Sequence, residues 1–379
     1  MKDYILRKLL NRGFLPVTVS CLILAVLALL PTGFEGAWRY QGSSHCAARV
    51  LSVNNDSIVD TGLIRSGEQT CALELLGGPF QGRTVQGYNL LNGSLESDKI
   101  FVPGDKALVL VSHAGGEILS VNMIDHYRIG YELLLGLIFA AVLVLFAGRT
   151  GLRAVLSFAL TVMMVWKVLV PLYLRGWPPV AVGLGIVVIL TVLIISLVYG
   201  FDRRALAATG GASAGLLVTC LLGAVFTGLF QIHGAVMSYS ESLLYSGYQY
   251  LDLTSIFTAS IFIGSSGAVM DLSVDITSAV YEVVQKKPDI GWREAAASGF
   301  NVGRAAMGTM TTTLLLAYSG GYVALLMVFM AQGTPLYNIL NYKYVSAEIL
   351  DTIVGSFGLV TVAPLTAITS GLFLTRRKA

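Results

Sequence analysis

The chain has 379 residues, of which 55% are hydrophobic and only 12% are charged, with 41 glycines and a formal net charge of +3. Soluble domains carry about 25% charged residues, so this composition excludes an ordinary soluble protein and indicates helices packed in a lipid bilayer. The small net charge gives no indication of a nucleic-acid partner.

Eight apolar runs approach or exceed the roughly 20 residues that a helix needs to cross about 30 Å of hydrocarbon. In chain order they are 14–30, 130–147, 154–174, 179–199, 211–232, 253–271 or beyond, 305–331 and 349–374. The first run follows Lys2, Arg7, Lys8 and Arg12, and no small-residue cleavage site follows it. We therefore expect an uncleaved membrane anchor rather than a removed signal peptide.

Basic residues are concentrated on one side of these runs. Alternating spans put Arg149, Arg153, Arg203, Arg204 and the basic residues of 286–304 and 376–378 on that side, while the short outer loops hold only Arg175 and Lys343. The positive-inside rule then predicts cytoplasmic N- and C-termini. Ser319, Gly320 and Gly321 interrupt the seventh run, so two half-helices are an alternative to one continuous span there.

Residues 36–128 differ from the rest of the chain. Short β-branched and leucine-rich runs such as AARVLSV and KALVLVS are separated by Gly, Pro, Asn and Asp, which is typical of strands at meander spacing. This length suits one small β barrel or sandwich, with an OB-like barrel among the candidates. We expect an anchor helix (1–35), an extracytoplasmic β domain (36–128) and a seven-helix membrane domain (129–379).

Two of the four cysteines, Cys46 and Cys71, fall in the predicted β domain. An oxidising compartment outside the cytoplasmic membrane favours disulfide formation, so we predict a Cys46–Cys71 bond. A metal site formed by His45 with these cysteines is an alternative, but the spacing matches no metal motif. We expect no metal and no other cofactor.

The segment GAVMDLSVDITSAVYEVV, residues 267–284, places carboxylates at the end of the sixth span. At 100° per residue, Gly264, Gly267, Asp271 and Asp275 lie on one narrow helical face. Asp271 lies about 27 Å from the start of the span, near the inner boundary of the hydrocarbon. A wetted face at the membrane surface is therefore as good an explanation as a working acidic pair.

The seventh span opens with NVGRAAMGTMTTT, in which Asn301, Arg304, Gly308 and Thr311 or Thr312 again share a face. Because the two spans run antiparallel, Arg304 is expected at the depth of the aspartates. Like charges four residues apart are unfavourable unless a cation or a shared proton relieves them. We therefore predict a polar seam in which Arg304 balances Asp271 and Asp275, with the three glycines as packing positions.

One string in the sixth span resembles an enzyme motif. Gly264-Ser265-Ser266-Gly267 matches the G-x-S-G of rhomboid proteases, but no histidine lies inside any span to act as the base that a serine nucleophile needs. A close-packing patch of small residues is the better explanation, so we do not expect an enzyme.

The strings GSSGAVMDLSVDITSAVYEV and SGFNVGRAAMGTMTTTLLLAYSGG, together with the order of the predicted spans, resemble the YibE/F family of bacterial membrane proteins. The resemblance covers most of residues 130–378 and is strongest over 264–321. It implies a multi-pass protein of the bacterial cytoplasmic membrane with no known cofactor, and it implies no established activity.

Two functions remain open at this point. The first is a secondary transporter or permease for a small molecule or ion, with the polar seam between spans six and seven as its working site. The second is a non-transporting envelope protein whose β domain binds a partner, either another envelope protein or a further copy of the chain. The feature that separates them is whether the seam borders a cavity. We favour transport, because anchoring spans have no need of charged side chains.

Overall fold

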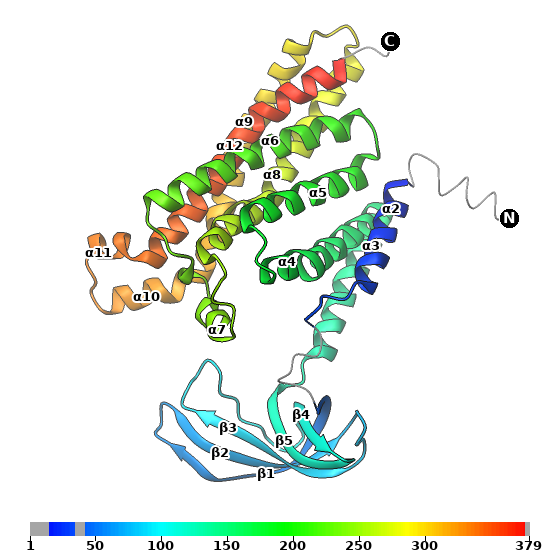
Figure 1. Cartoon of the computed structure of the whole chain (residues 1–379). Coiled ribbons are helices and arrows are strands. Elements are labelled where there is room, and N and C mark those ends of the chain that lie inside the picture. The colour runs from blue at the N-terminus through cyan, green and yellow to red at the C-terminus, as the bar shows by residue number, and fades with distance from the viewer. Residues whose placement is uncertain (1–14, 35–41, 376–379) are drawn as a thin grey trace, which may run out of the picture. The chain divides into compact units, whose positions relative to one another are not determined.

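The computed structural model describes residues 15–34 and 42–375 (Figure 1). The N-terminal basic residues, the first residues of the predicted β domain and the basic residues of 376–378 lie outside the described residues. The chain forms two compact units, one of Phe34–Leu145 and one of Met1–Gly33 with Phe146–Ala379. Each unit is described here by itself.

The first unit holds a small β barrel. Its strands are β1 (Ser43–Asp60), β2 (Arg65–Leu75), β3 (Thr84–Asn92), β4 (Lys106–Ala114) and β5 (Glu117–His126). They close in the order β1-β2-β3-β5-β4, and the β3–β5 contact is parallel while the other pairs are antiparallel. This is a closed, OB-like barrel, so the sandwich alternative is wrong.

Alternating burial along the strands builds the barrel interior. In β4, for example, Ala107, Val109 and Val111 are buried while the residues between them are only partly buried. The interior also holds Gln69, whose side chain donates to the Phe101 carbonyl oxygen at 3.0 Å and accepts from the Phe101 backbone N–H at 3.0 Å. Asn89 donates to the Gln69 side-chain oxygen at 3.1 Å, so these buried amides join β2, β3 and the segment before β4.

The predicted disulfide does not form. Cys46 and Cys71 are both free thiols buried in the barrel core. The strand register explains why, because Cys71 lies opposite Val53 of β1, seven positions along that strand from Cys46. At about 3.3 Å per residue this spacing far exceeds the roughly 7 Å between Cα atoms that a disulfide permits. No group of metal-ligating side chains is found among the described residues either.

The remaining elements are helical. They are α2 (Leu15–Leu29), α3 (Ile129–Met164), the π-helical turn η2 (Val165–Leu169), α4 (Val170–Leu174), α5 (Pro179–Tyr199), α6 (Arg203–Leu229), the 3₁₀ turn η3 (Gly234–Val236), α7 (Ser240–Tyr245), α8 (Leu253–Lys286), α9 (Trp292–Ser319), the 3₁₀ turn η4 (Gly320–Tyr322), α10 (Val323–Ala331), α11 (Leu336–Asn341) and α12 (Lys343–Thr375).

Six helical segments among the described residues are long and apolar enough to cross a membrane. The segment Ile129–Leu174, with 46 residues, contains two of the predicted spans. Gly148 separates them with a backbone φ of 55°, which glycine adopts readily. The predicted anchor corresponds to α2, whose 15 residues are fewer than a full span needs. The chain is thus a multi-pass helical membrane protein, and the count of eight spans stays a prediction.

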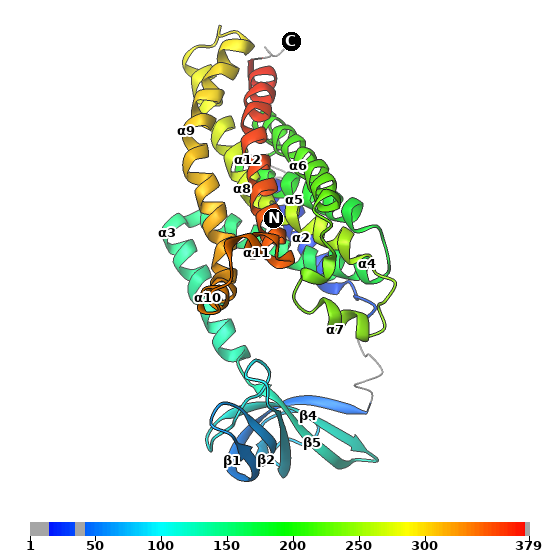
Figure 2. The ribbon, with the colours of Figure 1, turned by 90° about the vertical axis from the view of Figure 1, so that its left-hand side faces the viewer.

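In the second unit, α12 packs between α6, α8 and α9 (Figures 1 and 2). Small residues allow this approach, because a Cβ atom added to Gly211 of α6 would lie 2.6 Å from the Thr366 Cα atom of α12. Hydroxyl pairs connect α8 to the same helix, with 3.0 Å between the Ser273 and Thr366 hydroxyls and 2.9 Å between those of Thr277 and Ser370. The glycine-rich composition therefore builds a tight core around α12.

The seventh predicted span is interrupted. Helix α9 ends at Ser319, η4 follows, and the chain resumes as α10, which has 9 residues. The alternative of two helical segments is therefore the arrangement found. By itself α10 is too short to cross a membrane, and Trp292–Ala331 as a whole is one of the segments long and apolar enough to do so.

Candidate functional site

The acidic face predicted for residues 264–282 exists, but it points away from the helices that pack on α8. Asp271 and Asp275 are both exposed. The opposite face of α8, with Val269, Leu272 and Ile276, is fully buried in the core of the bundle. The two aspartates therefore lie on the outer surface of the unit rather than in a seam between helices.

Arg304 lies at the predicted level but not in the predicted contact. A Cβ atom at Gly303, its neighbour on α9, would lie 3.1 Å from the Ile276 side chain, which places Arg304 level with Asp275. Arg304 is nevertheless exposed, and among the described residues it forms no ion pair within 4.0 Å. Arg304 and Asp275 thus lie at a similar level along the two helices, and the structure does not bring the three charges together.

The other predicted polar residues of α9 also face outward or bond locally. Asn301 is exposed. The Thr311 hydroxyl donates to the Met307 carbonyl oxygen at 2.9 Å, and the Thr312 hydroxyl donates to that of Gly308 at 3.2 Å. Both bonds are internal to the helix, as is usual for threonines in apolar helices.

The three predicted packing glycines differ. A Cβ atom on Gly264 would lie 2.6 Å from the Tyr318 hydroxyl of α9, so this glycine allows a close approach. Gly267 and Gly308 have no atom within 4 Å of that position. The serines between Gly264 and Gly267 bond to their own helix, Ser265 to the Ile261 carbonyl oxygen at 3.1 Å and Ser266 to that of Ile263 at 2.7 Å, so they act as packing residues.

A second acidic pair, which the sequence analysis does not single out, lies on α12. Glu348 and Asp351 are three residues apart and occupy the same helical face. One turn further on, Gly355 contacts Ser265 of α8 and Leu314 of α9, so this face is directed at the α8–α9 pair. The Asp351 Oδ1 atom is buried and has no hydrogen-bond partner among the described residues.

Two tyrosines from the helix break surround these carboxylates. Tyr318 is in the last turn of α9, and its buried hydroxyl has no hydrogen-bond partner in the described part of the chain. Tyr322 ends η4 and lines the same cavity as Glu348. The side chains of Tyr318, Tyr322, Glu348 and Asp351 form what we call the tyrosine–carboxylate cluster.

The tyrosine–carboxylate cluster borders a cavity of about 260 Å³. Tyr322 and Glu348 line it, together with apolar side chains that include Leu326 and Ile349. Neither carboxylate forms an ion pair within 4.0 Å with a described lysine, arginine or histidine. Two acids without a basic partner, in a span and beside a cavity, can hold a shared proton or a small cation.

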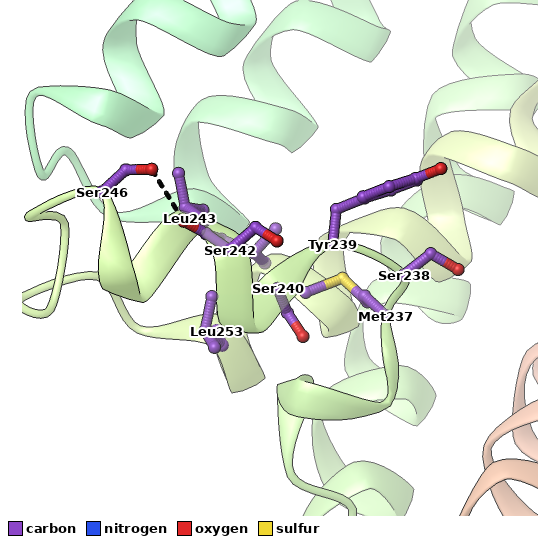
Figure 3. Close-up of a pocket in the computed structure, with 9 residues that line it drawn as sticks. Met237, Ser238, Tyr239, Ser240, Ser242, Leu243, Ser246 and Leu253 are labelled. Atoms are coloured by element: carbon purple, nitrogen blue, oxygen red, sulfur yellow. Dashed lines mark hydrogen bonds between the residues drawn. The ribbon is translucent and has the colours of Figure 1, made fainter. Parts of the chain in front are cut away.

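Three further cavities lie elsewhere. One of about 420 Å³ is lined by the segment from Met237 to Ser246 and by the start of α8 (Figure 3). Two of its hydroxyls bond locally, with Ser240 donating to the Ala235 carbonyl oxygen at 3.2 Å and Ser246 to that of Ser242 at 2.7 Å. A second, of about 530 Å³, lies between the end of α5 and the start of α6, and a third, of about 320 Å³, lies on the barrel. Asp271, Asp275 and Arg304 line none of these four cavities.

A family model described as YibE/F-like protein matches residues 135–376, which is more than half of the chain. The chain belongs to the YibE/F-like family. The match takes in the helical segments from α3 to α12 and stops short of the barrel. No curated protein and no solved structure matches the chain. Membership therefore supports a multi-pass membrane protein and assigns no activity.

Proposed function

We propose that this YibE/F-like protein is a secondary transporter or permease of the bacterial cytoplasmic membrane. Its tyrosine–carboxylate cluster holds the coupling ion, a proton or a small monovalent cation, on the way across. The orientation with cytoplasmic termini, taken from the distribution of basic residues, places the cluster in the outer half of the membrane.

The observation that carries the proposal is the unpaired acidic pair on α12. An ionised carboxylate in a membrane span is costly, so such groups are rare and are usually paired or functional. Glu348 and Asp351 lie on one helix face without a basic partner among the described residues, and Asp351 has a buried oxygen without a donor. Binding one proton or cation relieves the repulsion between the two acids, which gives the pair an ion affinity.

The broken helix supports the same conclusion. Interrupted helices occur at membrane depth where the freed backbone groups line a cavity or are packed in protein, and transporters use them at their binding sites. Here η4 separates α9 from α10 at the tyrosine–carboxylate cluster, and Tyr322 of this turn lines the neighbouring cavity. A change in the charge of the acidic pair can therefore act directly on the break.

The proposal is tested by recording charge displacement in proteoliposomes on a solid-supported membrane. A pH jump or a Na⁺ jump should give a transient current in the wild type, and which jump does so identifies the ion. Asp351→Asn should abolish the current, while Asp271→Asn, a matched change on the exposed face of α8, should keep it. Equal currents from both variants would remove the tyrosine–carboxylate cluster from the mechanism.

A scaffold function through the barrel is the second candidate. Leu63 and Leu95 are 78% and 77% exposed and line the cavity of the barrel. Exposed apolar side chains that form one contiguous patch are typical of a protein-interaction site. If Leu63→Asp with Leu95→Asp causes the cellular phenotype of a deletion while the ion-induced currents persist, the barrel and not the transport site carries the function.

A further inference from the structure

The exposed surfaces of α8 and α9 carry charges of both signs. Asp271 and Asp275 are exposed on α8, and Arg304 is exposed on α9. No ion pair among the described residues includes any of the three. Opposite charges that do not pair within one chain can pair with complementary charges on a binding partner.

The charges lie at one level along the membrane normal. Helices α8 and α9 run antiparallel, and Gly299 and Gly303 of α9 approach Val280 and Ile276 of α8. Arg304 is therefore level with Asp275, within about one helical turn. Both lie about 33 Å from the start of α8, close to the inner boundary of a hydrocarbon layer about 30 Å thick.

This geometry is self-complementary. A two-fold axis along the membrane normal carries each residue to the same depth in the second copy, and the same patch serves both copies. Arg304 of one copy can then meet Asp275 of the other, and the symmetric pair forms as well. A lipid phosphate could neutralise Arg304, but it would leave both aspartates unpaired. A second copy of the chain therefore neutralises more of the exposed charges.

The surface also has room for another helix. A Cβ atom at Gly267 of α8 or Gly308 of α9 would meet no atom within 4 Å, so both exposed faces are narrow at these points. Narrow faces let helix backbones approach closely in lipid. We infer that two copies of this chain associate through the outer face of α8 and α9, with exchanged Arg304–Asp275 ion pairs across the interface.

Charge reversal in mixed copies tests the exchange. Arg304→Asp alone places like charges at both ends of the interface, and so does Asp275→Arg alone. When one variant is mixed with the other, the mixed dimer restores both exchanged pairs, one with reversed sign and one with the wild-type sign. An ion pair within one chain cannot be restored by mixing, so this design separates the two arrangements.

The measurement is the dimer fraction of full-length, fluorescently labelled protein in phosphatidylcholine vesicles, counted by single-molecule photobleaching. We expect each single reversal to weaken association at least tenfold and the mixture to recover the wild-type value. Lys286→Asp, a reversal in the last turn of α8, should behave as the wild type. The milder Asp275→Asn and Arg304→Gln give the same test if a reversal prevents folding.

Three results would overturn the inference. They are a monomeric wild type, single reversals that dimerise normally, and a mixture that does not recover. Association that appears only with anionic lipid would assign Arg304 to a lipid headgroup instead. The assay requires no transport, so its outcome is independent of the proposed function.

Discussion

Two acidic pairs in this protein have similar spacing and opposite surroundings. Asp271 and Asp275 lie four residues apart on the exposed face of α8, where water and headgroups can solvate them. Glu348 and Asp351 lie three residues apart on α12, against a helix break, with one carboxylate oxygen buried and unpartnered. Helical spacing places two acids on one face in both cases. The neighbouring helices determine whether the carboxylates are solvated or are buried where they can bind an ion.

The largest expected effect concerns the packing that holds α12 in place. Gly211→Ala puts a methyl group 2.6 Å from the Thr366 Cα atom, and backbone cannot move aside as a flexible side chain can. Overpacking of this kind costs about 1–3 kcal/mol or more. Gly185→Ala, in α5, meets no atom within 4 Å and should be neutral or stabilising by up to about 1 kcal/mol.

Thermal unfolding of both variants in detergent measures the difference. A Gly211→Ala protein as stable as Gly185→Ala would show that α12 is not locked by its small neighbours. Tight packing of α12 would then no longer explain why Glu348 and Asp351 are held in place while Asp271 and Asp275 are exposed.

The next effect concerns the barrel, where the predicted oxidising compartment suggested a disulfide and the strand register separates the two thiols. Burial raises the pKa of the Cys71 thiol from 9.0 to about 11. The folded barrel keeps this thiol neutral while the unfolded chain ionises it, so the contribution of Cys71 to stability is full below pH 9 and is lost as the pH rises towards about 11.

Hydrogen exchange of the barrel strands in the whole protein between pH 8 and pH 11, corrected for the intrinsic exchange rate, measures this loss. Cys71→Ala should remove that part of the pH dependence, and a reducing agent at pH 7 should change nothing. A loss of protection on reduction would restore the disulfide that the structure excludes.

A smaller effect separates the two tyrosines of the tyrosine–carboxylate cluster. Tyr322→Phe removes a hydroxyl from the cavity that Glu348 also lines and should cost about 1 kcal/mol of stability. Tyr318→Phe removes a buried hydroxyl without a partner, so it should be neutral or slightly stabilising. Unfolding midpoints of the two variants in detergent give the order, and the reverse order would contradict the assigned contacts.

Much of the architecture follows from the sequence. The apolar runs predict the long helices, although they miss the short α7 and α11, and the glycine-punctuated runs predict a small β domain. The break at Ser319–Gly321 is also visible, because consecutive glycines weaken a helix. The strand register is not visible, and it is the register that keeps Cys46 and Cys71 apart.

The acidic pair on α12 is harder to find in the sequence. The predicted span begins at 349, which leaves Glu348 outside it and Asp351 at its edge, where acids are ordinary. Only the packing shows that Tyr322 and Glu348 line one cavity and that no basic residue among the described ones pairs with the two carboxylates. The sequence does contain an acid pair after the SGGY break. Its function can be inferred only from the contact between this break and α12, which are distant in the sequence.

The central claim is that the Glu348–Asp351 pair, which no described basic residue neutralises, binds the coupling ion and shares a proton when no other cation is present. Infrared difference spectroscopy of the protein in lipid measures this directly through the carbonyl band of protonated carboxyl groups. The account predicts a titrating band in the wild type that disappears in Asp351→Asn and persists in Asp275→Asn. A wild-type spectrum without such a band, or one that Asp351→Asn leaves unchanged, would contradict it.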